Sequence, residues 1–136
     1  MNSFDLDTRL QADSHFIADG PLSQWRLMDD ARFPWLVLVP RVEDAVELVD
    51  LDAALQQQLL DEINRAAQAL RRVGACEKLN IGALGNIVRQ LHVHIVARRE
   101  NDAAWPGPVW GSGAPVRYGV QEREALLLAL RAACST

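Results

Sequence analysis

The stretch VRQLHVHIVAR, residues 88–98, alternates polar and apolar side chains from Gln90 onward. Successive side chains of a β-strand point to opposite faces, so this pattern predicts a strand with one face in a core. The apolar residues face that core, and Gln90, His92 and His94 therefore project together from the other face. Two of the three histidines of the chain lie on this single face.

A His-x-His pair on a strand suits several kinds of site. Its two Cα atoms are ~6.5–7 Å apart, which places the imidazoles well to bracket one phosphate. Histidine also changes charge nearest neutral pH, so it acts there as a nucleophile, acid or base. The same pair suits a zinc site if His15, a cysteine or a carboxylate completes it. A third reading is two partly exposed polar residues without chemistry.

The remaining sequence predicts helices set apart from a run of strands. The long segment 52–73 has apolar residues at helical spacing, and Gly74 is placed to end it as a C′ glycine. The elements we expect are a short helix over 5–13 capped by Asp5, strands over 15–18, 23–28, 33–39, 78–81 and 88–98, the helix over 52–73, and a last helix over 121–133. Consecutive strands with separate helices indicate an α+β fold with an antiparallel sheet.

Length and composition place the chain among ordinary globular proteins. Its 136 residues form one expected domain, 1–136, with 49% hydrophobic residues, 24% charged residues and a net charge of −4. This acidic balance argues against general nucleic-acid binding, and no apolar run reaches the ~20 residues that span a bilayer. The polar N-terminus is unlike a secretory signal, and Cys76 and Cys134 suit reduced thiols. We expect a soluble cytoplasmic protein.

The stretch QLHVHIV, residues 90–96, resembles the histidine triad signature His-φ-His-φ-His-φ-φ, in which φ is apolar. Gln90 stands in place of the first histidine. The order of elements over residues 14–99 is also similar to that of the histidine triad (HIT) family. The resemblance implies a HIT-like fold, with a mainly antiparallel sheet of about five strands, a long helix and a C-terminal helix.

The resemblance also implies roles for the three signature residues. His92 matches the histidine that attacks the α-phosphate of a nucleotide, forming a nucleotidyl-histidine that water then cleaves. His94 matches the residue that contacts phosphate and assists the leaving group. Gln90 takes the position that supports the surroundings of the nucleophile. In the family, a backbone carbonyl of the signature strand holds the other ring nitrogen of the nucleophile.

The nucleotide-binding residues are implied in the same way. Asn80 and Gly82 match an Asn-x-Gly loop beside the phosphates, and Asn86 matches a polar residue that faces them. Asp29 matches the residue that holds the ribose hydroxyls. Leu27 and Phe33 are the expected apolar neighbours of that pocket.

Gln90 and Trp35 depart from the family pattern, since both stand where many members have histidine. A proton relay through these positions is missing. This predicts slow catalysis, reliance on His94 alone, or a leaving group that needs little protonation. The function expected first is hydrolysis or nucleotidyl transfer on nucleoside phosphoanhydrides, such as dinucleoside polyphosphates, or on phosphoramidates. The alternative is a catalytically weak or inactive nucleotide-binding or interaction protein.

The expected mechanism needs no metal or other cofactor, although a divalent cation can accompany a polyphosphate substrate. The resemblance implies a homodimer formed through the sheet and the long helix. The loop over residues 105–111, with Trp105 and Trp110, either closes over the nucleotide, reaches a partner subunit, or covers one end of the sheet. Arg98 shares the histidine face and is a candidate contact for a distal phosphate.

Overall fold

The computed structural model describes residues 4–134, so residues 1–3 and 135–136 of the expected domain lie outside the described part. The elements run in the order α1 (Thr8–Asp13), β1 (Ser14–Asp19), β2 (Ser23–Met28), β3 (Trp35–Pro40), η1 (Leu48–Asp50), α2 (Ala53–Val73), β4 (Lys78–Gly82), β5 (Val93–Arg98) and α3 (Val120–Cys134). This is the α+β fold expected from the sequence, with a long helix and a C-terminal helix.

The five strands form one antiparallel sheet in the order β1-β2-β3-β5-β4. The strand β3 lies at its centre, and all six of its residues are buried. The strand β5 is inserted between β3 and β4, with Val37 opposite His94 on one side and Gly82 opposite His94 on the other. The histidine strand is therefore an interior strand whose backbone is fixed from both sides.

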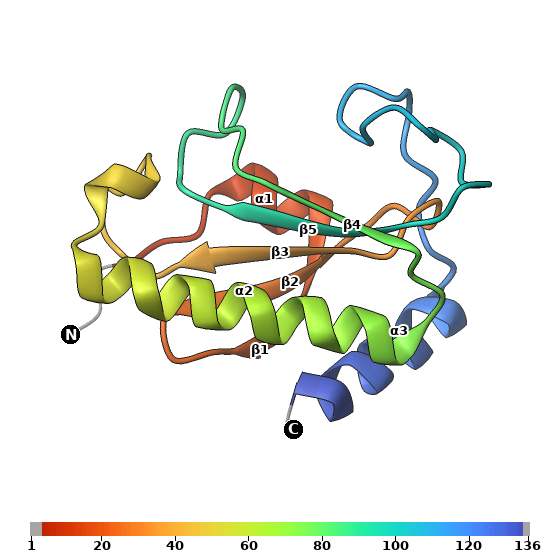
Figure 1. Cartoon of the computed structure of the whole chain (residues 1–136), viewed down its shortest axis with the longest axis horizontal. Coiled ribbons are helices and arrows are strands. Elements are labelled where there is room, and N and C mark those ends of the chain that lie inside the picture. The colour runs from red at the N-terminus through yellow and green to blue at the C-terminus, as the bar shows by residue number, and fades with distance from the viewer. Residues whose placement is uncertain (1–3, 135–136) are drawn as a thin grey trace.

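Each face of the sheet has its own core. On one face, α2 and α3 cover residues that include Leu36, Leu38 and Ile95. On the other face, Trp35 and Val37 pack with residues from α1 and from the segment 99–119. Figure 1 shows α2 and α3 on one side of the sheet, with α1 and the long loops on the other. The second face carries the histidines.

The helix α2 begins where Asp52 accepts a hydrogen bond from the N–H of Leu55 at 2.9 Å. Such a cap satisfies a backbone donor of the first helical turn that has no partner within the helix. The helix ends at Gly74, as expected, but the φ of Gly74 is −173°, which is extended backbone. Gly74 is therefore the C-cap and not the C′ residue expected from the sequence, and any residue type adopts the conformation observed.

Two boundaries differ from the sequence-based expectation by more than two residues. The short helix begins at Thr8 and not at residue 5, because the carboxylate of Asp7 caps it by accepting from the N–H of Arg9 at 2.8 Å. The strand expected over 88–98 begins only at Val93. Before that point the backbone leaves the sheet, and the N–H of Leu91 donates to the carbonyl of Ala45 at 3.0 Å.

Among residues 4–134, no helix combines the length and the apolar character that crossing a membrane requires.

Candidate active site

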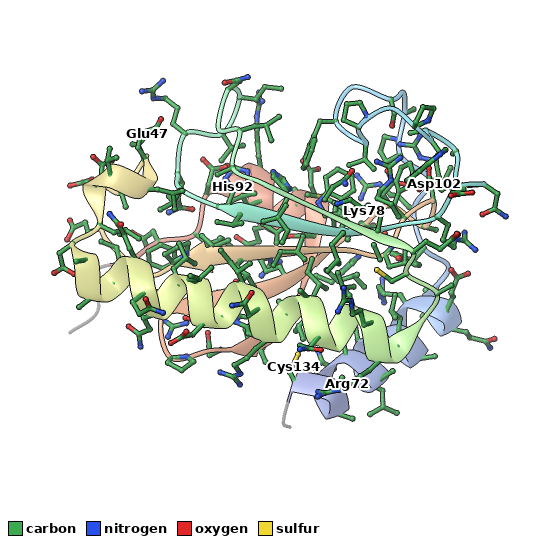
Figure 2. All side chains as sticks on the ribbon, viewed as in Figure 1. Glu47, Arg72, Lys78, His92, Asp102 and Cys134 are labelled. Carbon is green, nitrogen blue, oxygen red and sulfur yellow. The ribbon has the colours of Figure 1, made fainter. Side chains whose placement is uncertain are left out.

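His92 and His94 lie together on the face of the sheet away from α2. His94 belongs to β5 and His92 immediately precedes it, yet the alternation of faces continues across this boundary. The two ring centroids are 4.8 Å apart, and each residue is 6% exposed. Figure 2 shows His92 at the start of β5 and Asp102 beyond the other end of this strand.

The ring of His92 is oriented by backbone. Its Nδ1 lies 2.7 Å from the carbonyl oxygen of Gln90. A carbonyl only accepts hydrogen bonds, so Nδ1 carries the proton in the neutral ring and Nε2 keeps its lone pair. The geometry thus leaves the lone pair of Nε2 in His92 available.

The ring of His94 has the opposite arrangement. The indole Nε1–H of Trp35 donates to Nδ1 of His94 at 3.0 Å. An indole N–H only donates, so Nδ1 is the acceptor and Nε2 carries the proton. Burial, and then the neighbouring His92, lower the pKa of His94 to about 3. His94 is therefore neutral at physiological pH and offers an N–H donor.

Both histidines line a cavity of about 640 Å³. This volume lies within the ~300–1,000 Å³ typical of small-molecule sites. The cavity wall combines residues of α1, the end of β2, the loop before His92 and the segment 109–117. Of the nucleotide-binding residues expected from the sequence, Asp29 and Asn86 lie in this wall.

Asp29 is held at the cavity by several donors. Its carboxylate accepts from the backbone N–H of Tyr118 and from Arg117, both at 2.9 Å, and Nε2 of His15 lies 3.2 Å away. Burial alone would raise the pKa of Asp29, but these hydrogen bonds outweigh it and lower the pKa. Asp29 is therefore an ionised acceptor, and its four lone-pair sites leave capacity for further donors.

The family model of the HIT domain matches residues 9–101, which include the histidine pair and most of the sheet. The chain belongs to the HIT domain family. This membership supports a function of the nucleotide-binding or nucleotide-hydrolase type. No curated protein matches the chain.

Three solved histidine triad proteins share the fold over nearly their whole length. A histidine triad protein from Bradyrhizobium japonicum is 50% identical, with a TM-score of 0.94 over 96% of this chain and 98% of that one. One from Sinorhizobium meliloti is 46% identical, with a TM-score of 0.95 over 98% of each chain. One from Marinobacter aquaeolei is 38% identical, with a TM-score of 0.94 over 97% of this chain and 96% of that chain.

Within the HIT domain, the side chain of Gln90 turns away from the two histidine rings. Its Oε1 accepts from the N–H of Asp7 and its Nε2 donates to the carbonyl of Asp5, both at 2.8 Å. Gln90 thus holds the N-terminal segment with its side chain and orients His92 with its backbone carbonyl.

The two expected apolar neighbours of the pocket lie elsewhere. Leu27 is fully buried on the face covered by α2 and α3. Side chains alternate between the two faces along β2, so its neighbour Met28 faces the cavity and Leu27 does not. Phe33 is fully buried on the histidine side without lining the cavity, and the guanidinium groups of Arg32 and Arg98 lie over its ring. Phe33 therefore belongs to the buried core on the histidine side of the sheet and not to the surface of the cavity.

Asn80 and Arg98 form a structural contact with each other. Arg98 is 1% exposed; it donates to Oδ1 of Asn80 at 2.7 Å and pairs with Asp102 at 2.8 Å. A third bond goes to the carbonyl of Gly107 at 2.8 Å. Arg98 therefore anchors the loop after β5, and it is not the phosphate contact considered from the sequence. Oδ1 of Asn80 accepts a hydrogen bond in this network, and Asn80 does not line the cavity.

Trp110, in the loop over residues 105–111, contacts the face of the sheet that carries the histidines. The ring of Trp110 lies 5.5 Å from that of His94 and 6.4 Å from that of Trp35, measured between centroids. A Cβ added at Gly82 would lie 3.5 Å from the Trp110 ring, so this glycine, which does not line the cavity, borders the tryptophan. Of the readings left open from the sequence, Trp110 favours a loop that closes the site.

Sequence reasoning missed three arginines in the cavity wall, Arg9, Arg32 and Arg117. Arg32 and Arg117 each pair with an aspartate of that wall, Asp30 and Asp29 respectively. Nothing in the local sequence around Arg117 points to a residue 88 positions earlier. Within residues 4–134, no group of three or more His, Cys, Asp or Glu side chains is arranged to hold a metal ion.

Proposed function

We propose that this HIT protein is a nucleotide-phosphate hydrolase or nucleotidyl transferase that acts at the α-phosphate through a covalent nucleotidyl-His92. The observation that carries the proposal is the 2.7 Å contact between Nδ1 of His92 and the carbonyl of Gln90. It leaves the lone pair of Nε2 available, on a residue that lines a nucleotide-sized cavity.

In the first step, Nε2 of His92 forms a bond to the α-phosphorus, and the bond from this phosphorus to the leaving group breaks. The electron pair departs with the leaving group, and the imidazole becomes a cation whose Nδ1–H stays hydrogen-bonded to the Gln90 carbonyl. Covalent catalysis of this kind divides one difficult hydrolysis into two easier steps. The Nε2–H of His94 supplies a hydrogen bond to the oxygens on which charge develops.

In the second step, a water oxygen attacks the same phosphorus and the P–N bond breaks. Its electron pair returns to Nε2 of His92, and the proton of the water passes to solvent. The products are a nucleoside monophosphate and the free enzyme. An alcohol or a phosphate in place of water makes the same step a nucleotidyl transfer.

The cavity wall supports recognition of a (di)nucleoside polyphosphate or a nucleoside phosphoramidate. Asp29 is an ionised acceptor suited to ribose hydroxyls, and Asn86 lines the same cavity with an amide group of the kind that donates to phosphate oxygens. Arg9 brings a positive charge to the same wall, as suits an anionic phosphate chain, whereas Arg32 and Arg117 are paired with Asp30 and Asp29. The two proposed steps require no metal, and a divalent cation would enter only bound to a polyphosphate substrate.

The homodimer expected from the resemblance remains part of the proposal. β4 is an edge strand, and exposed apolar side chains lie on it and on the loop that follows: Ile81, Leu84 and Ile87. An edge strand with exposed apolar residues favours pairing with another chain. We also propose a cytoplasmic location, to which two free cysteines, Cys76 and Cys134, are suited.

Hydrolysis in ¹⁸O-labelled water tests the proposed function. With a dinucleoside triphosphate as substrate, attack at the α-phosphorus places one ¹⁸O in the nucleoside monophosphate and none in the diphosphate product. Label in the diphosphate would contradict the proposal. Binding of the nucleotide without turnover of any donor would instead support the weak or inactive binding protein.

A further inference from the structure

We propose that Trp35 is a positioning residue that fixes His94 as a permanent Nε2–H donor, which restricts the site to leaving groups that depart as stable anions. Among the substrates above, this selects nucleoside phosphoanhydrides over phosphoramidates. The inference rests on the proposed function and narrows its substrate class.

The contact between Trp35 and His94 follows from the register of the sheet. Trp35 of β3 lies opposite Val96, and Val37 lies opposite His94, so Trp35 is the diagonal neighbour of His94 on the same face. Diagonal neighbours are within reach of large aromatic side chains. The indole N–H meets Nδ1 at 3.0 Å, with the two rings inclined by 60°.

The surroundings hold this geometry in place. Trp35 is 8% exposed and His94 is 6% exposed, and the rings of His92 and Trp110 flank His94. The charged side chains that line the same cavity are Arg9, Asp13, Asp29, Asp30, Arg32 and Arg117. Two of these aspartates are paired with arginines, and the partner of Nδ1 in His94 is an indole and not a carboxylate.

An indole changes what His94 can do chemically. A carboxylate at Nδ1 would stabilise the imidazolium, so that the ring could deliver a proton through Nε2. The N–H of Trp35 has no lone pair to receive the Nδ1 proton of an imidazolium, and it repels that proton. His94 is left neutral, as its lowered pKa also indicates, and a neutral imidazole donates a hydrogen bond without giving up its proton.

The leaving group then decides the rate. When a phosphoanhydride is cleaved, the electron pair moves onto the oxygen of a phosphate or nucleotide, which is stable without a proton. When a phosphoramidate is cleaved, the nitrogen must gain a proton as the P–N bond breaks, since an amide anion is a very poor leaving group. General acid catalysis contributes ~10²–10⁴-fold, and this contribution is what a neutral His94 lacks.

Nitrogen-15 NMR of the histidine rings tests the Trp35–His94 contact without any substrate. In the wild type we expect His94 to show one tautomer, protonated at Nε2, that stays neutral where an ordinary histidine titrates. Trp35→Phe keeps an aromatic ring but removes the donor, so Nδ1 protonation should become detectable, as the second tautomer or as the cation. Trp110→Phe is the matched control, because Trp110 contacts the same ring without a hydrogen bond to it, and it should leave the tautomer unchanged. An unchanged His94 tautomer in Trp35→Phe would overturn the inference.

Kinetics then test the substrate class. We expect kcat/KM for a dinucleoside triphosphate to exceed that for the matched nucleoside phosphoramidate by at least ~100-fold. Trp35→Phe should lower kcat for the triphosphate by about three- to ten-fold, with KM less affected, as for loss of one hydrogen bond. Equal rates on both substrates would overturn the inference and leave the nucleotidyl-His92 mechanism intact. Failure to cleave either substrate would overturn both proposals.

Discussion

The Nδ1 atom of His92 lies 2.7 Å from the backbone carbonyl oxygen of Gln90, while the Gln90 side chain binds the backbone of the N-terminal segment. Gln90 therefore has two separable tasks. Its carbonyl, which every residue type possesses, sets the tautomer of His92. Its amide holds a neighbouring segment of chain.

Gln90→Ala separates these tasks. The substitution removes two hydrogen bonds at a half-buried site, and we expect the free energy of unfolding to fall by about 1–2 kcal/mol. Turnover should fall far less than in His92→Ala, because the carbonyl at position 90 remains. Urea denaturation and steady-state kinetics measure the two effects. A loss of turnover equal to that of His92→Ala would mean that the amide itself takes part in the chemistry.

The lowered pKa of His94, about 3, predicts a pH dependence of stability. Below pH ~6.5 the unfolded chain protonates this residue while the folded protein does not, so acid favours unfolding. The stabilisation is complete above that pH and is lost as the pH falls toward 3. In His94→Gln the free energy of unfolding should decline less between pH 7 and 4 than in the wild type. Parallel pH curves for the two proteins would contradict the assignment.

The buried pair of Arg98 and Asp102 predicts a large loss of stability on its removal. Their side chains are 1% and 2% exposed. Asp102→Ala leaves the guanidinium buried without its partner, which costs about 3–5 kcal/mol. The control is Asp19→Ala, which removes an exposed pair with Arg41 and should cost less than ~1 kcal/mol. Equal costs for the two variants, measured by urea denaturation, would contradict this account of the loop anchor.

Asp102 also contributes to acid sensitivity. The hydrogen bonds from Arg98 hold the pKa of its carboxyl well below the usual range. The stabilisation is therefore present above the unfolded pKa of about 3.9 and is lost as the pH falls below it. The Asp102→Ala protein should show a shallower decline in stability below pH ~4 than the wild type does.

The sequence predicted the elements well where periodicity is strong. The helical spacing over 52–73 and the apolar run of β3 each reflect burial along one whole element, which a local pattern records. The start of β5 could not be predicted, because the alternation of polar and apolar residues runs from Gln90 through His94, whereas the pairing with β3 begins only at Val93. Leu91 instead bonds to Ala45, a contact that depends on how distant segments pack.

For the site, the sequence predicted His92 and His94 on one face of a strand, and both residues line the cavity. It did not place Leu27 correctly, since a shift of one residue along a strand turns a side chain to the opposite face. The role of Trp35 depends on a cross-strand register between residues 59 positions apart. Such partners are set by tertiary structure and leave no local signal.

The most direct test of the central claim is to trap the nucleotidyl-enzyme. The protein is mixed with an adenylyl donor and quenched in alkali, in which a phosphoramidate survives, and its peptides are analysed by mass spectrometry. We expect AMP on the peptide that contains His92, with no adduct in His92→Ala and a retained adduct in Gln90→Ala. Turnover without an adduct, or an adduct that persists in His92→Ala, would contradict the assignment of His92 as the nucleophile.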